Sequence, residues 1–203
     1  QLMRNHGEVV ISDKGDDDII NTLGWNYRLT EIQAAIGIPQ LQKLDFHIKK
    51  RQKLAMCLTE SLKEFSFLVT PETSNNCSHT YYLYPIRYLK HILGISRNTF
   101  FKAMLAEGVH IGEGYVKPIY LEPMYQKKIA YGELGCPFSC SFYSGEPKYN
   151  KGACQKAEIL YFQESLITNI CRHPNDEIEI EEFVKAVKKI LYNIDFLRKL
   201  EKE

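Results

Sequence analysis

Residues 24–44 read GWNYRLTEIQAAIGIPQLQKL, and the interpretation of the whole chain starts from this stretch. Thr30 is followed three residues later by Gln33, the spacing of a capping box, in which each side chain bonds the other residue's backbone N–H. The spacing predicts that a helix begins at Thr30. Asn26 and Arg28 then lie just ahead of the positive end of that helix, where side chains can face an anion. A loop with packed aromatic residues and a turn-forming asparagine would give the same pattern without any ligand.

The same stretch predicts two consecutive helices. Gly37 suits the end of a short first helix, and Pro39 suits the first turn of a second one that continues to about Phe65. Apolar residues recur along the second helix every three or four positions, which indicates one buried stripe on a long amphipathic helix. The residues of this stripe are Leu41, Leu44, Ile48, Ala55, Leu58, Leu62 and Phe65.

Short strand-like and helical segments alternate in the rest of the chain. Strands are predicted near residues 9–11, 67–71, 80–87, 109–115 and 166–170, and helices over 98–108, from 157 onwards and over 180–197. We therefore predict an α+β fold, with a small, mainly antiparallel sheet, packed helices and one long helix.

Composition excludes several classes of protein. The chain has 203 residues, is 44% hydrophobic and 25% charged, and carries a formal net charge of +1. Such a balance gives no electrostatic reason to expect a nucleic-acid partner, and no apolar run is long enough to predict a membrane span. Six cysteines are too few for a disulfide framework in a chain of this length, so we expect reduced thiols and a cytoplasmic protein.

Two patterns could suggest metal binding, and neither is specific. Cys136 and Cys140 are followed by a lone Cys154, and His173 is distant, so the paired spacing of a zinc site is missing. The acidic triplet at 16–18 could bind a cation, although such runs are more often solvated loops. We predict no metal site.

The stretch that begins at Gly24 closely resembles the signature G-x-N-Y-R-[ML]-T-E-[IL]-x-A-A-I of the DegT/DnrJ/StrS family of sugar aminotransferases, which depend on pyridoxal 5'-phosphate. The likeness runs from about His6 to the last helix. It implies the C-terminal part of a fold-type I aminotransferase, with its small domain. By that likeness residues 1–29 are the tail of the large cofactor domain, 30–65 are bridging helices and 66–203 are the small domain.

The resemblance also implies an activity. Family members transfer an amino group from glutamate or glutamine to a keto-sugar, commonly nucleotide-linked, in amino-sugar, lipopolysaccharide or glycan biosynthesis. They act as homodimers in which the loop that carries the asparagine reaches across the interface. By that likeness Asn26 would hydrogen-bond the cofactor phosphate of the partner subunit, and Arg28 would lie near the substrate.

Two further segments extend the resemblance. Residues 79–87 are similar to the family strand H-x-Y-Y-x-[FY]-x-[IV]-R, which implies a substrate-side role for His79, although a histidine at a strand end can also be purely structural. Residues 115–125, YVKPIYLEPMY, are similar to a segment that lines the substrate cleft. Lys117 and Tyr120 are therefore candidate contacts to the nucleotide-sugar, or else parts of a proline-ordered surface loop. Many relatives carry histidine where Tyr120 stands.

No segment of this sequence resembles the surroundings of the family's cofactor-binding lysine, so the catalytic lysine is expected outside this chain. The chain alone is then predicted to be inactive. The alternative is a non-catalytic remnant of the family that dimerises or binds a nucleotide-sugar.

Overall fold

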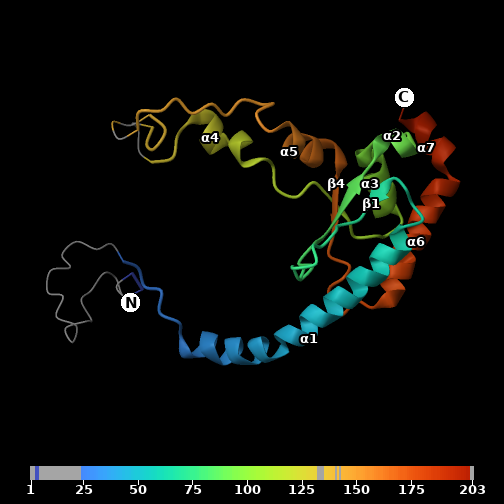
Figure 1. Cartoon of the computed structure of the whole chain (residues 1–203), viewed down its shortest axis with the longest axis horizontal. Helices are drawn as coiled ribbons and strands as arrows, with labels where there is room; N and C mark the ends of the chain where they lie inside the picture. The colour runs from blue at the N-terminus through green and yellow to red at the C-terminus, as the bar shows by residue number, and fades with distance from the viewer. Residues whose placement is uncertain (1–2, 5–23, 132–134, 140, 142, 202–203) are drawn as a thin grey trace. The chain divides into compact units, whose positions relative to one another are not determined.

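One helix, α1 (Glu31–Leu62), runs through the stretch for which the sequence predicted two (Figure 1). Its predicted start is confirmed, because the Thr30 N–H donates to Gln33 Oε1 at 2.9 Å and the Gln33 N–H donates to Thr30 Oγ1 at 3.2 Å. The predicted break is wrong. Gly37 does not adopt the left-handed backbone that ends a helix, and Pro39 lies inside α1, where it removes one backbone hydrogen bond without stopping the helix.

The structure, a computed structural model, describes residues 3–4, 24–131, 135–139, 141 and 143–201. The chain divides into two units, 1–46 and 47–203, and α1 contributes to both. The predicted strand at 9–11, the acidic triplet at 16–18 and Cys140 lie outside the described residues. Within the described part, no helix is long and apolar enough to cross a membrane.

Four short antiparallel strands form the sheet of the second unit, in the order β1-β2-β4-β3. They are β1 (Leu68–Val69), β2 (Tyr84–Tyr88), β3 (Gly112–Glu113) and β4 (Ser165–Thr168). Burial alternates strictly along β2, with Tyr84, Ile86 and Tyr88 buried, so one face of the sheet lies on the core. The α+β class and the small antiparallel sheet predicted from the sequence are confirmed.

The second half of α1, α3 (Arg97–Ala106) and α6 (Glu177–Tyr192) supply the helical side of this core. α1 and α6 lie side by side (Figure 1). Two exposed ion pairs lie along this contact, Lys53 of α1 with Glu177 at the start of α6, and Glu64, two residues beyond the end of α1, with Lys188 of α6, so the two helices run in the same direction. The core side chains of these helices are Leu54, Ala55, Leu58 and Leu62 from α1, Phe100 and Met104 from α3, and Ile180, Phe183, Val187 and Ile190 from α6.

The single helix predicted over 180–197 is two helices. α6 begins earlier because Asp176 and Glu179 form a reciprocal capping box, with the Ile178 N–H donating to Asp176 Oδ1 at 2.8 Å. It ends at Tyr192, and α7 (Ile194–Leu200) follows. At the junction the Asn193 side chain donates to the Lys189 carbonyl at 2.9 Å, which satisfies a carbonyl at the end of α6.

All four strands predicted within the described residues are shorter than expected. The strand predicted over 67–71 is reduced to β1, and the one predicted over 166–170 is β4, which begins one residue earlier and ends two residues sooner. The strand predicted over 80–87 starts only at Tyr84, because Tyr81 has a positive φ of 48° and its N–H donates to His79 Nδ1 at 2.8 Å. The strand predicted over 109–115 is reduced to β3, since Gly114 has a φ of 64°. Both residues turn the backbone away from extended geometry.

A long connection, which we call the 115–159 segment, leaves the sheet after β3 and contains short helices: η2 (Ile119–Leu121), α4 (Pro123–Lys127) and α5 (Gln155–Ile159). Its two ends are tied together. Gln126 Nε2 donates to the carbonyls of Tyr120 and Tyr149, both at 2.6 Å. The rings of Tyr125, Phe138 and Tyr149 also pack edge to face, with centroids 5.2–6.0 Å apart.

Arg97 is the buried charge at the base of this segment. Its side chain is only 6% exposed, and Nη1 donates to the Tyr161 carbonyl at 2.7 Å and to the Ser165 carbonyl at 3.2 Å. These carbonyls belong to the π-helix η3 (Leu160–Glu164) and to β4, which follow α5 directly. The Gly114 N–H donates to the same Ser165 carbonyl at 2.8 Å. Arg97 and its neighbours thus hold both stems of the 115–159 segment together.

We predict that Arg97→Leu lowers the free energy of unfolding by about 1–3 kcal/mol, because it leaves the Tyr161 carbonyl without its donor. Urea unfolding measures the loss, and hydrogen exchange should show faster exchange in the 115–159 segment. Arg97→Lys keeps the charge but not the planar fork of the guanidinium. Its free energy of unfolding should therefore lie between that of the unchanged chain and that of Arg97→Leu. Arg87→Lys is the matched control, since Arg87 pairs with Glu164 at a half-exposed site and this change should lower stability much less than Arg97→Leu does. Equal losses at both positions would contradict the account.

The first half of α1 exposes apolar side chains on several of its faces, and we call these residues the α1 apolar patch. The patch consists of Ile32, Ile36, Ile38, Leu41 and Leu44. Leu41 and Leu44 were predicted to lie on the buried stripe of this helix, and that prediction is wrong for them, because they are 72% and 47% exposed. Exposed apolar side chains in this number favour association.

A solution of this chain alone should therefore self-associate, with an average mass by light scattering above that of the monomer. The double change Ile32→Glu and Leu41→Glu should shift the chain toward monomer, because it places charges in the patch. Ile178→Glu, at a comparably exposed isoleucine of α6, should have no such effect. A clean monomer of the unchanged chain would refute the prediction.

Candidate functional site

The loop before α1 presents its side chains to solvent. Trp25 and Tyr27 stack with ring centroids 6.5 Å apart and are both more than 60% exposed. Asn26 is exposed, and its Oδ1 accepts a long hydrogen bond of 3.5 Å from the Arg28 N–H. Among the described residues, the Asn26 amide nitrogen donates to no other group. Its two N–H donors are therefore available to an anion ahead of the helix.

Arg28 is exposed, and within the described part of the chain no carboxylate pairs with its guanidinium. The two hydrogen bonds of the Thr30–Gln33 capping box fix Thr30, which follows this loop. The loop can thus offer an amide donor and a free guanidinium, which are the groups that bind phosphate or carboxylate oxygens.

His79 lies in the second unit and holds its own loop together. Nδ1 accepts from the Tyr81 N–H, and the His79 ring lies 4.3 Å from the Tyr81 ring, centroid to centroid. Gln52 of α1 donates to the His79 carbonyl at 3.1 Å. Because Nδ1 is an acceptor, the proton of the neutral ring is on Nε2, the nitrogen that remains open to a ligand.

Lys117 and Tyr120 lie close together in sequence on the 115–159 segment, and each has an acidic neighbour. Lys117 Nζ is 3.4 Å from Glu122 Oε2, and both side chains are about one-third to two-fifths exposed. The Tyr120 hydroxyl donates to Glu158 Oε1 and accepts from the Cys154 N–H at 3.3 Å. The segment therefore carries a cation and a hydroxyl group three residues apart in the sequence.

Glu158 is a residue that the sequence analysis gave no role. It lies on α5, and besides the Tyr120 hydroxyl it accepts from the Gly152 N–H at 2.6 Å. The two hydrogen bonds, that of Tyr120 first, lower the pKa of Glu158 below its ordinary value. No signal in the sequence pairs Tyr120 with a residue 38 positions away, because the pairing depends on how the segment folds back.

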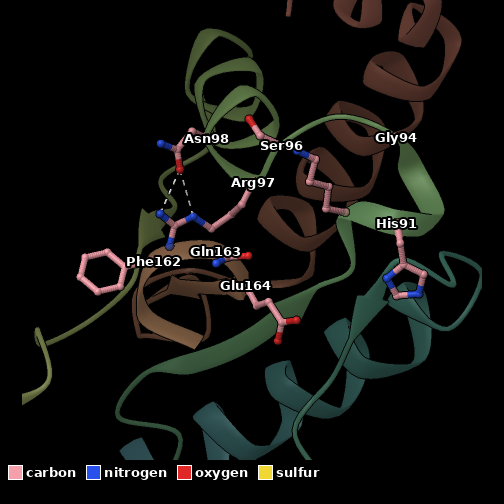
Figure 2. Close-up of a pocket in the computed structure, with 9 residues that line it drawn as sticks. His91, Gly94, Ser96, Arg97, Asn98, Phe162, Gln163 and Glu164 are labelled. Carbon is pink, nitrogen blue, oxygen red and sulfur yellow. Dashed lines mark hydrogen bonds between the residues drawn. The ribbon is translucent and has the colours of Figure 1, made fainter. Parts of the chain in front are cut away.

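A surface pocket of about 650 Å³ lies elsewhere, between α2 (Lys90–Leu93), the start of α3 and η3 (Figure 2). In Figure 2 the Arg97 guanidinium is held by two hydrogen bonds to Asn98, Phe162 and Gln163 lie beside it, and Gly94 and His91 lie on the other side of the view. None of the five site residues predicted from the sequence lines this pocket. Two of its charged groups have partners outside the pocket, Arg97 with Glu113 and backbone carbonyls, and Glu164 with Arg87.

The described part of the chain contains no cluster of three potential metal ligands. Cys57, Cys77, Cys154 and Cys171 are thiols. Burial raises the pKa of Cys171 to about 12, so this thiol is a packing residue and not a nucleophile.

The predicted site residues thus fall into two groups by unit, Asn26 and Arg28 in the first unit, and His79, Lys117 and Tyr120 in the second. No described contact joins His79 to Lys117 or Tyr120.

A comparison with known proteins covers both groups of predicted site residues. The model of the DegT/DnrJ/EryC1/StrS aminotransferase family matches residues 1–147, which include all five predicted site residues. The chain is 30% identical over 146 residues to the UDP-4-amino-4,6-dideoxy-N-acetyl-beta-L-altrosamine transaminase of Campylobacter jejuni, over 72% of this chain and 37% of that protein. It is 31% identical over 104 residues to the GDP-perosamine synthase of Caulobacter vibrioides, over 51% of this chain and 28% of that protein.

The fold has counterparts among solved structures. An aminotransferase from Psychrobacter cryohalolentis superposes with a TM-score of 0.71 at 20% identity, over 95% of this chain and 48% of that chain. This likeness concerns the fold, and the chain spans less than half the length of these relatives. Since the family model covers most of its residues, the chain belongs to the DegT/DnrJ/EryC1/StrS aminotransferase family.

Proposed function

We propose that this chain is the C-terminal part of a pyridoxal-phosphate-dependent aminotransferase. The enzyme transfers an amino group from glutamate or glutamine to a nucleotide-linked keto-sugar, in amino-sugar, lipopolysaccharide or glycan biosynthesis. Family membership supports the reaction class. The names of the Campylobacter and Caulobacter relatives, a UDP-sugar transaminase and a GDP-sugar synthase, support the substrate class.

The observation that carries the proposal is the exposed Asn26 amide at the start of α1. An amide with free N–H donors, beside the positive end of a 32-residue helix, fits the phosphate group of the cofactor. We propose that Asn26 binds this phosphate across a homodimer interface and that Arg28 binds substrate. The bound cofactor supplies the electron sink for transamination.

The described residues fit the phosphate end of the cofactor only. A lysine that attaches such a cofactor needs an environment that lowers its pKa, by loss of solvent or by a neighbouring cation. No described lysine is buried. We propose that this lysine belongs to a part of the protein outside these residues, so that the chain alone does not catalyse the reaction.

On the substrate side, we propose that Lys117 contacts a phosphate of the nucleotide. Its partner Glu122 is loose enough, at 3.4 Å, for a phosphate oxygen to replace it. We propose that His79 contacts the substrate through Nε2. A nucleotide-linked substrate and reduced thiols are consistent with the cytoplasm as the place of action.

In the intact natural protein, Asn26→Ala should weaken cofactor binding by about 10- to 150-fold, the effect of losing one hydrogen bond to a charged group of about 1.5–3 kcal/mol. Asn26→Asp should weaken it further, because a carboxylate repels phosphate. Cofactor titration followed by absorbance measures both, and turnover with glutamate or glutamine and a nucleotide-linked keto-sugar is measured at saturating cofactor.

Asn75→Ala, at another exposed asparagine, is the control and should leave both quantities unchanged. Unaltered cofactor affinity in Asn26→Ala would overturn the role of this residue. A wild-type protein that binds nucleotide-sugars but no cofactor would overturn the enzyme and favour a non-catalytic member of the family.

A further inference from the structure

Hydrogen bonds hold Tyr120 at its backbone carbonyl and at its side-chain hydroxyl. Its carbonyl accepts from Gln126 Nε2 at 2.6 Å, and its hydroxyl lies between Glu158 and the Cys154 N–H. These partners come from α4, α5 and the turn before α5. A half-buried tyrosine fixed at its carbonyl and at its hydroxyl has little freedom to turn the ring.

The hydrogen bonds that the Tyr120 hydroxyl already makes determine whether it can still donate to a ligand or accept from one. A phenol has one proton to donate and oxygen lone pairs that accept. Glu158, ionised at neutral pH, can only accept, so the Tyr120 proton points to the carboxylate. The Cys154 N–H occupies one accepting position on the phenol oxygen. What Tyr120 can offer to a bound molecule is therefore an acceptor position, and not a proton.

Glu158 is itself held in place. Its Oε1 accepts from the Gly152 N–H at 2.6 Å, and Gly152 has a φ of 94°, a left-handed backbone that favours glycine. Burial and the contact with Glu158 raise the pKa of Tyr120 above its ordinary value, which keeps the phenol protonated.

We propose that Glu158 is a positioning residue that fixes the Tyr120 phenol as a hydrogen-bond acceptor for a hydroxyl group of the sugar. This inference rests on the proposed function, because it takes the nucleotide-linked sugar as the ligand. It separates two tasks on the 115–159 segment. Lys117 attracts the phosphates of the nucleotide. Tyr120 donates its proton to Glu158, so it accepts a hydrogen bond from a sugar hydroxyl and does not bind phosphate oxygens.

The test uses the intact natural protein and calorimetric titration with UDP-, GDP- and dTDP-linked hexoses, each beside its free nucleoside diphosphate. For the sugar nucleotide that binds, Tyr120→Phe should raise the Kd by roughly three- to tenfold, the effect of one neutral hydrogen bond. The Kd of the free diphosphate should not change. Glu158→Ala should raise the sugar-nucleotide Kd similarly, and Glu158→Gln should restore most of the affinity because the amide oxygen still accepts from the phenol.

The double variant Tyr120→Phe with Glu158→Ala distinguishes positioning from general damage. If Glu158 acts through the phenol, the double variant binds as Tyr120→Phe does, because the two effects are not additive. Tyr131→Phe and Glu146→Gln, exposed residues of the same segment, are the matched controls and should bind normally.

The outcomes separate the two proposals. Fully additive losses, or a Tyr120→Phe variant that binds the sugar nucleotide as the wild type does, would overturn the positioning role and leave the aminotransferase proposal standing. An equal loss for the free diphosphate would overturn the assignment to a sugar hydroxyl. A wild-type protein that binds none of these sugar nucleotides would overturn both proposals.

Discussion

The buried guanidinium of Arg97 is the contact on which the 115–159 segment depends. A charge that is 94% withdrawn from solvent needs several hydrogen bonds, and Arg97 finds them on Asn98 and on the carbonyls of Tyr161 and Ser165. A π-helix changes the hydrogen-bond pattern of the backbone, and Arg97 stabilises it where it joins β4. The segment is thereby anchored to α3 and to the sheet at the point where both of its stems emerge.

The anchor at Arg97 explains how the 115–159 segment, which has little regular structure, can hold its side chains in fixed positions. At the other stem, Gly114 packs against Tyr161, where an added Cβ would lie 3.0 Å from the ring. From there the internal bonds of Gln126, Glu158 and the aromatic cluster fold the segment back on itself. Lys117 and Tyr120 are presented by this folded segment, while Asn26 and Arg28 belong to the loop before α1. The proposed enzyme therefore draws on two separately stabilised parts of the chain.

Much of this could be predicted from the sequence. The capping box at Thr30 is a local pattern, and local hydrogen bonds made its prediction reliable, whereas the equally local capping box of Asp176 and Glu179 was not recognised and the last helix was predicted to begin too late. The α+β class followed from alternating short segments. The break at Gly37 and Pro39 was wrong because these residues permit a helix end without requiring one. The strand at 80–87 began late because the side chain of His79 bonds the Tyr81 N–H, which propensity does not register. Arg97 and Glu158 were missed because the contacts that give them their roles, with the Tyr161 and Ser165 carbonyls and with Tyr120, join residues 38 to 68 positions apart.

The central claim is that these residues belong to an aminotransferase whose cofactor-binding lysine lies elsewhere in the protein. Borohydride reduction of the intact natural protein loaded with cofactor, followed by peptide mapping, tests it most directly. The account predicts one modified lysine, in a peptide outside the 203 residues of this chain. A modified lysine within this chain, or no modified lysine at all, would contradict it.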